Sequence, residues 1–388
     1  MTGAIIGWSH TRFGKLAETR VEDLICEVAA DALVHAALEP KDVDAIYIGQ
    51  FNGGFVRQEF PASLVLGLDP ALRFKPATRV ENACATGSAA IHQGLNMIAA
   101  KRARRALVIG VEKMSEITGD AVGDTLIKCA YLEEEGDIEG GFAGVFGRIA
   151  QSYFQKYGDQ SDALARIAAK NHKNGAANPL AHLRKDLGYD FCRAEGHANP
   201  FVAGPLKRTD CSLVSDGAAA LVLADPDTAE TAPQVVGFRA AEHVNDFFPM
   251  SKRDVVAFEG CGEAWRRARA TAGIEMFDLD FVETHDCFTI AELLEYEAMG
   301  LARAGRGGTI VTEGISEPGG RLPVNPSGGL KSKGHPIGAT GVSMHALACM
   351  QLAGAAGDMQ IPDATLAGIF NMGGAAVANY VSVLERLR

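Results

Sequence analysis

"VENACATGSAAIHQG", residues 80–94, places a single cysteine between an extended approach and a run of residues with very small side chains. Residues 77–82 have the pattern of a strand and residues 85–101 that of a helix, which predicts Cys84 at a strand-to-helix turn. The unpaired N–H groups and the positive dipole end of such a helix favour a thiolate over a thiol. The small side chains predict a helix that can be buried and that lets a substrate approach the sulfur. Alternatively, Cys84 is a small buried hydrophobic residue, a common role for a free cysteine.

Short apolar runs alternate with helical stretches along much of the chain. Residues 21–38 place Leu24, Val28 and Ala32 on one side at helical spacing, and Pro40 ends the pattern. Such alternation predicts an α/β fold with sheets covered on both faces. The runs expected to form strands are residues 44–50, 105–112, 218–225, 233–238, 280–287, 364–371 and 375–384.

Residues 116–211 differ in composition from the flanking chain, being first acidic and then polar, which predicts a large insertion over the sheet. An acidic run at 133–141 is expected to be a solvated loop, and polar, Asn-rich sequence follows at 170–186. A small-residue turn leads into an apolar helix and then a strand both at 84–110 and at 338–370. This weak internal similarity is compatible with a duplicated fold.

A second stretch that contains candidate functional residues is "NPSGGLKSKGHPIGATGVSMHAL", residues 325–347. Its glycines permit left-handed turns and close backbone approach, and Pro336 fixes the backbone after His335. It matches neither of the common glycine-rich nucleotide motifs. A lone histidine in a turn is often structural, but with a cysteine partner His335 is a candidate general base.

The third stretch is "VETHDCFTIAELLEYEAMGL", residues 282–301. We expect the strand at 280–287 to carry His285 and Cys287 to its end, where open α/β sheets place their sites, and a helix to follow. Three adjacent residues, His285, Asp286 and Cys287, rarely wrap one ion, so no metal site is expected here.

Composition limits the classes of function. With 388 residues, 47% of them hydrophobic, the chain can form two packed halves. A net charge of −11 argues against a nucleic-acid surface. The eight cysteines form no C-x-x-C pair, which favours a reducing cytoplasm over a zinc site or a disulfide framework. We also expect no signal peptide and no membrane span.

Together these stretches resemble the thiolase superfamily, most closely its sterol-carrier-protein-type branch. The resemblance spans nearly the whole chain and is carried by "AIIGWSHTRFGK" (4–15), "NACATG" (82–87), "HDCF" (285–288), "NPSGGLKSKGHPIGATG" (325–341) and "FNMGGAAVANY" (370–380). It implies two similar βαβαβαββ halves in a five-layered αβαβα arrangement. The halves would span residues 1–228, including a loop domain at about 116–211, and 229–388. It also implies a homodimer or homotetramer.

The resemblance further implies roles for individual residues. Cys84 matches the nucleophile and His335 the histidine that activates it. The late cysteine of better-known thiolases is absent, because those positions hold Asn371, Met372 and Gly373; Cys287 would replace it as the acid/base. His285 and His335 would bind the enolate oxygen, and the N–H groups of Cys84 and Gly373 would form a second oxyanion hole. Substrate-binding candidates are Phe288, Met372 and Asn371, with Phe142 and Phe146 from the loop domain.

The implied activity is that of an acyltransferase of lipid metabolism, a 3-oxoacyl-CoA thiolase or acetyl-CoA acetyltransferase. Coenzyme A would be its co-substrate, and no permanently bound cofactor is expected. Two alternatives remain open at this point. One is a decarboxylating condensing enzyme that uses Cys84, His285 and His335; the other is a CoA-binding or aldolase-like subunit that acts with an accessory protein.

Overall fold

The computed structural model describes residues 3–388 and contains a nine-stranded sheet with the order β3-β2-β4-β7-β1-β8-β11-β10-β9. Its first five strands form the N-terminal half. In this half β2 pairs in parallel with β3 and β4, whereas β7 is antiparallel to both β4 and β1. The strands are β1 (Ala4–His10), β2 (Ala45–Gly49), β3 (Ala77–Val80), β4 (Arg105–Glu112) and β7 (Gly217–Ala224).

The C-terminal half repeats this topology. Its strands are β8 (Val236–Asn245), β9 (Phe281–Glu283), β10 (Leu366–Gly373) and β11 (Ala378–Arg386). A parallel bridge joins Val324 to Val282 at the free edge of β9. If the strands of each half are numbered along the chain, with Val324 as the third element here, both halves have the order 3-2-4-5-1. The halves meet where β1 pairs with β8, at Ala4–Gly237 and Ile5–Val236.

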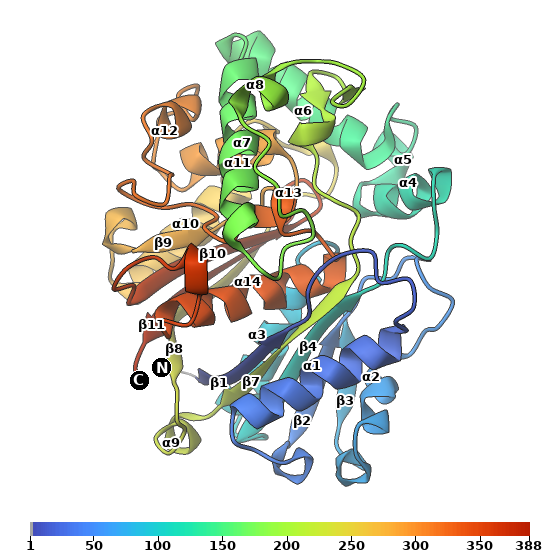
Figure 1. Ribbon diagram of the computed structural model, residues 1–388, viewed down its shortest axis with the longest axis vertical. Helices are drawn as coiled ribbons and strands as arrows, with labels where there is room; N and C mark the ends of the chain where they lie inside the picture. The colour runs from blue at the N-terminus through green and yellow to red at the C-terminus, as the bar shows by residue number, and fades with distance from the viewer. Residues whose placement is uncertain (1–2) are drawn as a thin grey trace.

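Helices complete the layers around the two halves of the sheet. Helix α1 (Val21–His35) covers the outer face of the first half, and α10 (Glu259–Ala272) covers that of the second. Between the halves lie α3 (Thr86–Ala99) and α14 (Ile337–Leu352), which pack against each other (Figure 1). Helix α14 contacts strands of both halves and is buried along nearly its whole length, which explains why it is apolar on all sides. The five-layered α/β fold predicted from the sequence is confirmed.

The insertion lies at the top of Figure 1, above the strands and helices of the two halves. It is more helical than its polar sequence suggests. Its elements are α4 (Asp120–Leu126), α5 (Leu132–Glu135), α6 (Gly141–Tyr157), α7 (Ser161–Ala177), α8 (Tyr189–Arg193) and the hairpin of β5 (Phe201–Ala203) and β6 (Leu206–Lys207). Within the acidic run, Glu133 and Glu134 are exposed as expected, but Glu135 is buried and accepts a hydrogen bond from the Met250 N–H.

The remaining α-helices are short, apart from α11 (Thr289–Ala298), which packs between α10 and α7. They are α2 (Pro61–Leu64), α9 (Pro226–Ala229), α12 (Gly308–Thr312) and α13 (Gly329–Ser332). None of the helices in residues 3–388 combines the length and apolar character that crossing a bilayer requires. The boundary expected at residue 228 falls between β7 and β8 and stays a prediction.

One predicted strand is too long. The run 280–287 was expected to be extended throughout, but β9 ends at Glu283. The N–H groups of Asp286 and Cys287 turn back to the carbonyl oxygens of Thr284 and His285. The Asp286 carboxylate meanwhile accepts hydrogen bonds from the backbone of Leu330 in α13. These contacts bend the chain out of the sheet, so His285 and Cys287 project from a tight turn instead of a strand.

Candidate active site

Cys84 stands two residues before the first residue of α3, Thr86, and is 3% exposed. Ala83, the residue before it, has a φ of 48°, a left-handed conformation that is unfavourable for a residue with a side chain. Gly373 packs directly against this turn, because a Cβ there would lie 2.5 Å from the Asn82 carbonyl oxygen. The turn thus presents the sulfur at the positive end of the helix dipole, as expected from the sequence.

Two imidazoles face this sulfur. His285 comes from the turn after β9, and His335 stands two residues before Ile337, the first residue of α14. Their rings meet edge to face with centroids 5.1 Å apart. Cys84 Sγ and one nitrogen of each ring lie within 4.8 Å of one another. Each Nδ1 has another protein partner, so it is the Nε2 atoms that face the sulfur.

The two sulfur atoms expected at the site have opposite electrostatic surroundings. Hydrogen bonding from Cys129, and then from His285 and His335, lowers the pKa of Cys84 well below the ordinary thiol value, against the effect of burial. Burial and the neighbouring Cys84 charge raise the pKa of Cys287 well above that value. Cys84 is therefore suited to be a thiolate nucleophile, and Cys287 to hold a proton as a thiol acid.

Cys129 is a third thiol at the site, and sequence reasoning missed it. It ends a short 3₁₀ helix, Ile127–Cys129, in the inserted region, and is 3% exposed. Its hydrogen bond to Cys84 raises the pKa of the Cys129 thiol well above the ordinary value, so it acts as a donor. No local motif marks this residue, because only folding brings it to the sulfur. Cys129 does not line the apolar cavity described next, whereas Cys287 does.

An apolar cavity of about 140 Å³ opens beside Cys84. The expected acyl-pocket residues Phe142 and Phe288 line it, and Phe146 stacks on Phe288 from outside. Met372 is fully buried in the core and is not part of the lining. The residues around the cavity are Cys84, Met114, Leu126, Phe142, Ala143, Val202, Cys211, Ser212, Leu213, Val214, Cys287, Phe288 and His335.

The turn that carries His285 and Cys287 is held from two sides. On one side, the Asp286 carboxylate accepts hydrogen bonds from the Leu330 N–H at 2.6 Å and the Asn171 side-chain amide at 2.7 Å. Burial, together with the charge of Glu292, raises the pKa of Asp286 to about 7. The carboxyl group therefore ties the turn to both α13 and α7.

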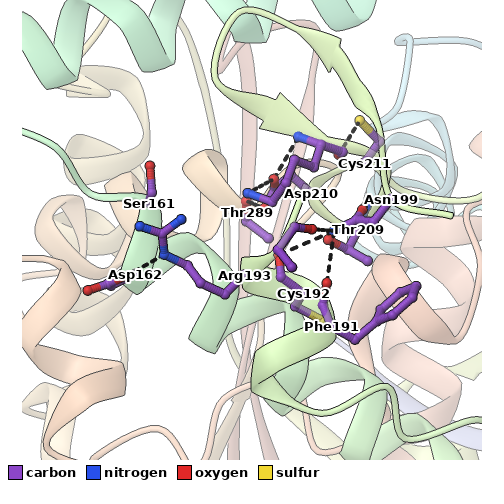
Figure 2. A network of polar contacts seen from close by, with 12 residues as sticks. Ser161, Asp162, Phe191, Cys192, Arg193, Asn199, Thr209, Asp210, Cys211 and Thr289 are labelled. Carbon is purple, nitrogen blue, oxygen red and sulfur yellow. Dashed lines mark hydrogen bonds and ion pairs between the residues drawn. The ribbon is translucent and has the colours of Figure 1, made fainter. Parts of the chain in front are cut away.

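On the other side, the loop before β7 holds the start of α11 (Figure 2). The Thr289 hydroxyl donates a hydrogen bond to the Asp210 carboxylate at 2.8 Å, and the Ser212 N–H donates to the Cys287 carbonyl oxygen at 2.9 Å. Asn199 links this loop to the end of α8, since its side-chain oxygen accepts from the Thr209 N–H at 2.9 Å and its amide donates to the carbonyl oxygens of Phe191, Cys192 and Ala194. The inserted region thereby fixes the position of Cys287 relative to the cavity.

A buried carboxylate, also missed from the sequence, supports His335. Glu112, at the end of β4, accepts hydrogen bonds from the N–H groups of Phe51 and Asn52 at 2.9 and 3.0 Å. It also accepts one from Gly338 at 3.0 Å, three residues after His335. Burial raises the pKa of Glu112 to about 7. Glu112 thus anchors the first turn of α14 to the N-terminal half.

Comparison with known proteins agrees with this architecture. The family model described as "Thiolase, N-terminal domain" matches residues 3–227, and "Thiolase C-terminal domain-like" matches residues 241–386. The chain belongs to the thiolase family. The acetyl-CoA acetyltransferase of Methanothermobacter thermautotrophicus is 34% identical over 391 residues, with 99% of each chain covered. Human sterol carrier protein 2 is 33% identical over 390 residues, which cover 95% of this thiolase and 69% of that protein.

Solved structures share the thiolase fold over the full length. Human mitochondrial 3-ketoacyl-CoA thiolase in complex with CoA superposes with a TM-score of 0.77 at 18% identity, covering 100% of this chain and 98% of that one. The Ltp2-ChsH2(DUF35) aldolase gives a TM-score of 0.83 at 22% identity, with the same coverage.

Proposed function

We propose that this thiolase cleaves or forms a C–C bond in 3-oxoacyl-CoA thioesters through an acyl intermediate on Cys84. The observation that carries the proposal is the meeting of Cys84, His285 and His335 beside an apolar cavity that Cys287 also lines. Relatives named acetyl-CoA acetyltransferase support CoA as the co-substrate. In the proposal CoA is consumed and regenerated as a substrate, and the chain uses no permanently bound cofactor.

In the cleavage direction, the Cys84 thiolate attacks the 3-oxo carbon and the bond between C2 and C3 breaks. The electron pair of that bond forms the enolate of acetyl-CoA, which takes a proton from the Cys287 thiol. Acetyl-CoA then leaves, and the acyl group stays on Cys84. The raised pKa of Cys287 and its position on the cavity suit this proton donation.

In the second half of the cycle, the Cys287 thiolate takes the proton of the incoming CoA thiol. The CoA thiolate attacks the acyl group, releases acyl-CoA and restores the Cys84 thiolate. Transfer between two sulfur atoms changes the energy little, because the bond that forms resembles the bond that breaks. Condensation follows the same steps in reverse.

Negative charge develops on an oxygen atom in both halves of the catalytic cycle, and hydrogen-bond donors must stabilise it. We propose that His285 and His335 serve the enolate oxygen, and that the N–H groups of Cys84 and Gly373 serve the tetrahedral intermediate. The close packing of Gly373 on the Cys84 turn supports the second assignment. Loss of one such donor typically raises the barrier by roughly 3 kcal/mol.

The test is thiolysis of acetoacetyl-CoA with free CoA. The disappearance of the 3-oxoacyl thioester measures the rate. The wild type should turn over, and Cys84→Ala and Cys287→Ala should both be inactive, because the first lacks the nucleophile and the second lacks the proton donor for the enolate. Unchanged activity of Cys84→Ala would refute the proposal. A panel of 3-oxoacyl chain lengths then defines the acyl group.

Two alternatives have distinct outcomes in the same assays. A decarboxylating condensing enzyme would show activity only with a malonyl thioester, and the thiol acid at Cys287 argues against it. An aldolase-like or CoA-binding subunit would leave Cys84 inert toward alkylation and would need a partner protein. The lowered pKa of Cys84 favours the thiolase.

We further propose a cytoplasmic homodimer or homotetramer. Strand β3 lies at the edge of the sheet with its outer side unpaired among the described strands, and such an edge favours pairing with a second copy. All eight cysteines are free thiols, which fits a reducing compartment. Light scattering coupled to size exclusion gives the oligomeric state directly.

A further inference from the structure

His285 and His335 both turn Nε2 toward Cys84, yet their other ring nitrogens have different partners. His285 Nδ1 lies 2.9 Å from the Asn371 amide nitrogen, and His335 Nδ1 lies 2.6 Å from the Thr340 hydroxyl. Neither Nε2 has a partner elsewhere among residues 3–388. The hydrogen bond at one ring nitrogen decides whether the other carries the proton. The partners of Nδ1 therefore determine what each histidine can do at the sulfur.

The orientation of the Asn371 side chain follows from its contact with Cys84. Its Nδ2 lies 3.1 Å from the Cys84 carbonyl oxygen, which can only accept a hydrogen bond. The amide NH₂ group must therefore be on this side, and Oδ1 accepts from the Ser88 hydroxyl at 2.8 Å. A Cβ on Gly341 would lie 2.5 Å from Asn371 Oδ1 and 2.6 Å from Ser88 Oγ, so α14 packs closely over this pair.

This orientation assigns the proton of His285. The second N–H of the Asn371 amide points at His285 Nδ1, so Nδ1 must offer a lone pair. Burial lowers the pKa of His285 to about 4, which keeps the ring neutral near pH 7. A neutral ring with a lone pair on Nδ1 carries its hydrogen on Nε2. His285 is thus a donor toward Cys84 and the cavity.

The opposite assignment holds for His335. The Thr340 hydroxyl donates its single hydrogen to the Pro336 carbonyl oxygen at 3.0 Å. It must therefore accept from His335, whose Nδ1 carries a hydrogen. In the neutral ring Nε2 then holds a lone pair. His335 is thus an acceptor toward the Cys84 thiol and becomes a donor toward the thiolate once it has taken that proton.

We propose that Asn371, held by Ser88, is a positioning residue that keeps His285 in the Nε2–H form, so that His335 alone serves as the base. His335 takes the proton of the Cys84 thiol and gains an N–H, whereas His285 is a donor throughout the cycle. The inference rests on the proposed function for its consequence, but the proton positions themselves need no substrate. It also disfavours a metal at Cys84, His285 and His335, because an ion would need a lone pair on both Nε2 atoms.

The direct test uses wild-type protein labelled with ¹⁵N-histidine, without substrate, at pH 7.5. Long-range ¹H–¹⁵N spectra distinguish the two tautomers, and His285→Gln and His335→Gln assign the signals. We expect His285 to carry hydrogen on Nε2 alone and His335 to carry hydrogen on Nδ1, with a second hydrogen on Nε2 when Cys84 is a thiolate. The same tautomer at both rings, or the reverse pair, overturns the inference. Thiolysis by the same sample tests the proposed function separately.

The second test replaces Asn371 by aspartate, which keeps the shape but offers His285 only acceptors. In Asn371→Asp the His285 hydrogen should move to Nδ1, and kcat should fall about 100-fold, as for a lost oxyanion donor. The matched control is Asn379→Asp, a buried amide whose carbonyl partners are Val244, Ala376 and Val377. It should leave the His285 signals unchanged. A His285 ring that stays Nε2–H in Asn371→Asp, or an equal loss of kcat in folded samples of both variants, would contradict the proposal.

Discussion

Phe146 of α6 stacks on Phe288, with ring centroids 4.5 Å apart and ring planes inclined by 22°. Phe288 directly follows Cys287 in the chain, and Phe146 belongs to the inserted region. Phe288 lines the apolar cavity, so this wall is backed by a residue from a distant part of the chain that reaches it only after folding. Substitutions in α6 should accordingly change substrate preference without touching the reacting atoms.

Phe142→Ala should favour longer acyl chains. Phe142 lines the cavity, and removing its ring leaves room for further methylene groups. Each methylene that becomes buried contributes about 0.8 kcal/mol, so two of them should raise kcat/KM relative to acetoacetyl-CoA roughly tenfold. Steady-state kinetics with a series of 3-oxoacyl-CoA substrates measures this ratio. Phe154→Ala, on the same helix but outside the cavity lining, is the control; an equal shift in that variant would contradict the cavity assignment.

Cys129→Ala should make Cys84 a weaker nucleophile near neutral pH. Hydrogen bonding from Cys129 is the largest influence that lowers the pKa of Cys84, so its removal should raise that pKa. At a fixed pH below the midpoint, a higher pKa means a smaller thiolate fraction. The rate of Cys84 alkylation by iodoacetamide, measured against pH, should therefore have its midpoint at higher pH. Cys192→Ala removes a buried thiol elsewhere in the inserted region and should leave the midpoint in place.

Thr289→Val should lower stability by about 1–3 kcal/mol, the usual cost of a buried polar group left without its partner. The valine keeps the shape of threonine but leaves the buried Asp210 carboxylate without the hydroxyl donor (Figure 2). Thr289→Ser keeps the hydroxyl group and should lose less stability than Thr289→Val. Urea unfolding of both variants measures the difference. Equal free energies of unfolding for serine and valine would show that the hydrogen bond contributes nothing.

Lys170→Met should lower the free energy of unfolding by about 3–5 kcal/mol, because it removes one partner of a fully buried ion pair. This loss is larger than the one expected for Thr289→Val. Lys170 Nζ lies 2.6 Å from the Glu292 carboxylate and 2.7 Å from the Val324 carbonyl oxygen. This pair joins α7 to α11 beside the turn that carries Cys287. Lys173→Met, at an exposed position of the same helix, should change the midpoint of thermal unfolding little. Similar losses in the two variants would be inconsistent with a structural role for the buried pair.

The sequence predicts well what is decided locally. The turn at Cys84 is found because an extended segment meets a run of small residues, and the helix after His335 because its apolar pattern follows a proline. The strand positions are likewise recognised from short apolar runs, although β8 extends to Asn245, well beyond the predicted end at 238. Long-range hydrogen bonding to a neighbouring strand sets that length, and no local pattern encodes it.

The features that escaped prediction depend on contacts between distant parts of the chain. Cys129 and Glu112 reach the site from elements whose sequences contain no recognisable motif. The role of Asn371 in binding substrate stays a prediction, but its amide contacts Cys84, Ser88 and His285 in the folded protein. Similarly, Asp286 bends the chain after β9 through a contact with α13 that only folding creates.

The repeated strand order gives the two proposed catalytic residues equivalent positions. Helices α3 and α14 occupy equivalent places in the two halves, and Cys84 and His335 each stand two residues ahead of them, before Thr86 and Ile337. A symmetric pair of identical units would carry the same residue at both places. Joining two different halves in one chain is what lets one position hold a thiol while its counterpart holds an imidazole.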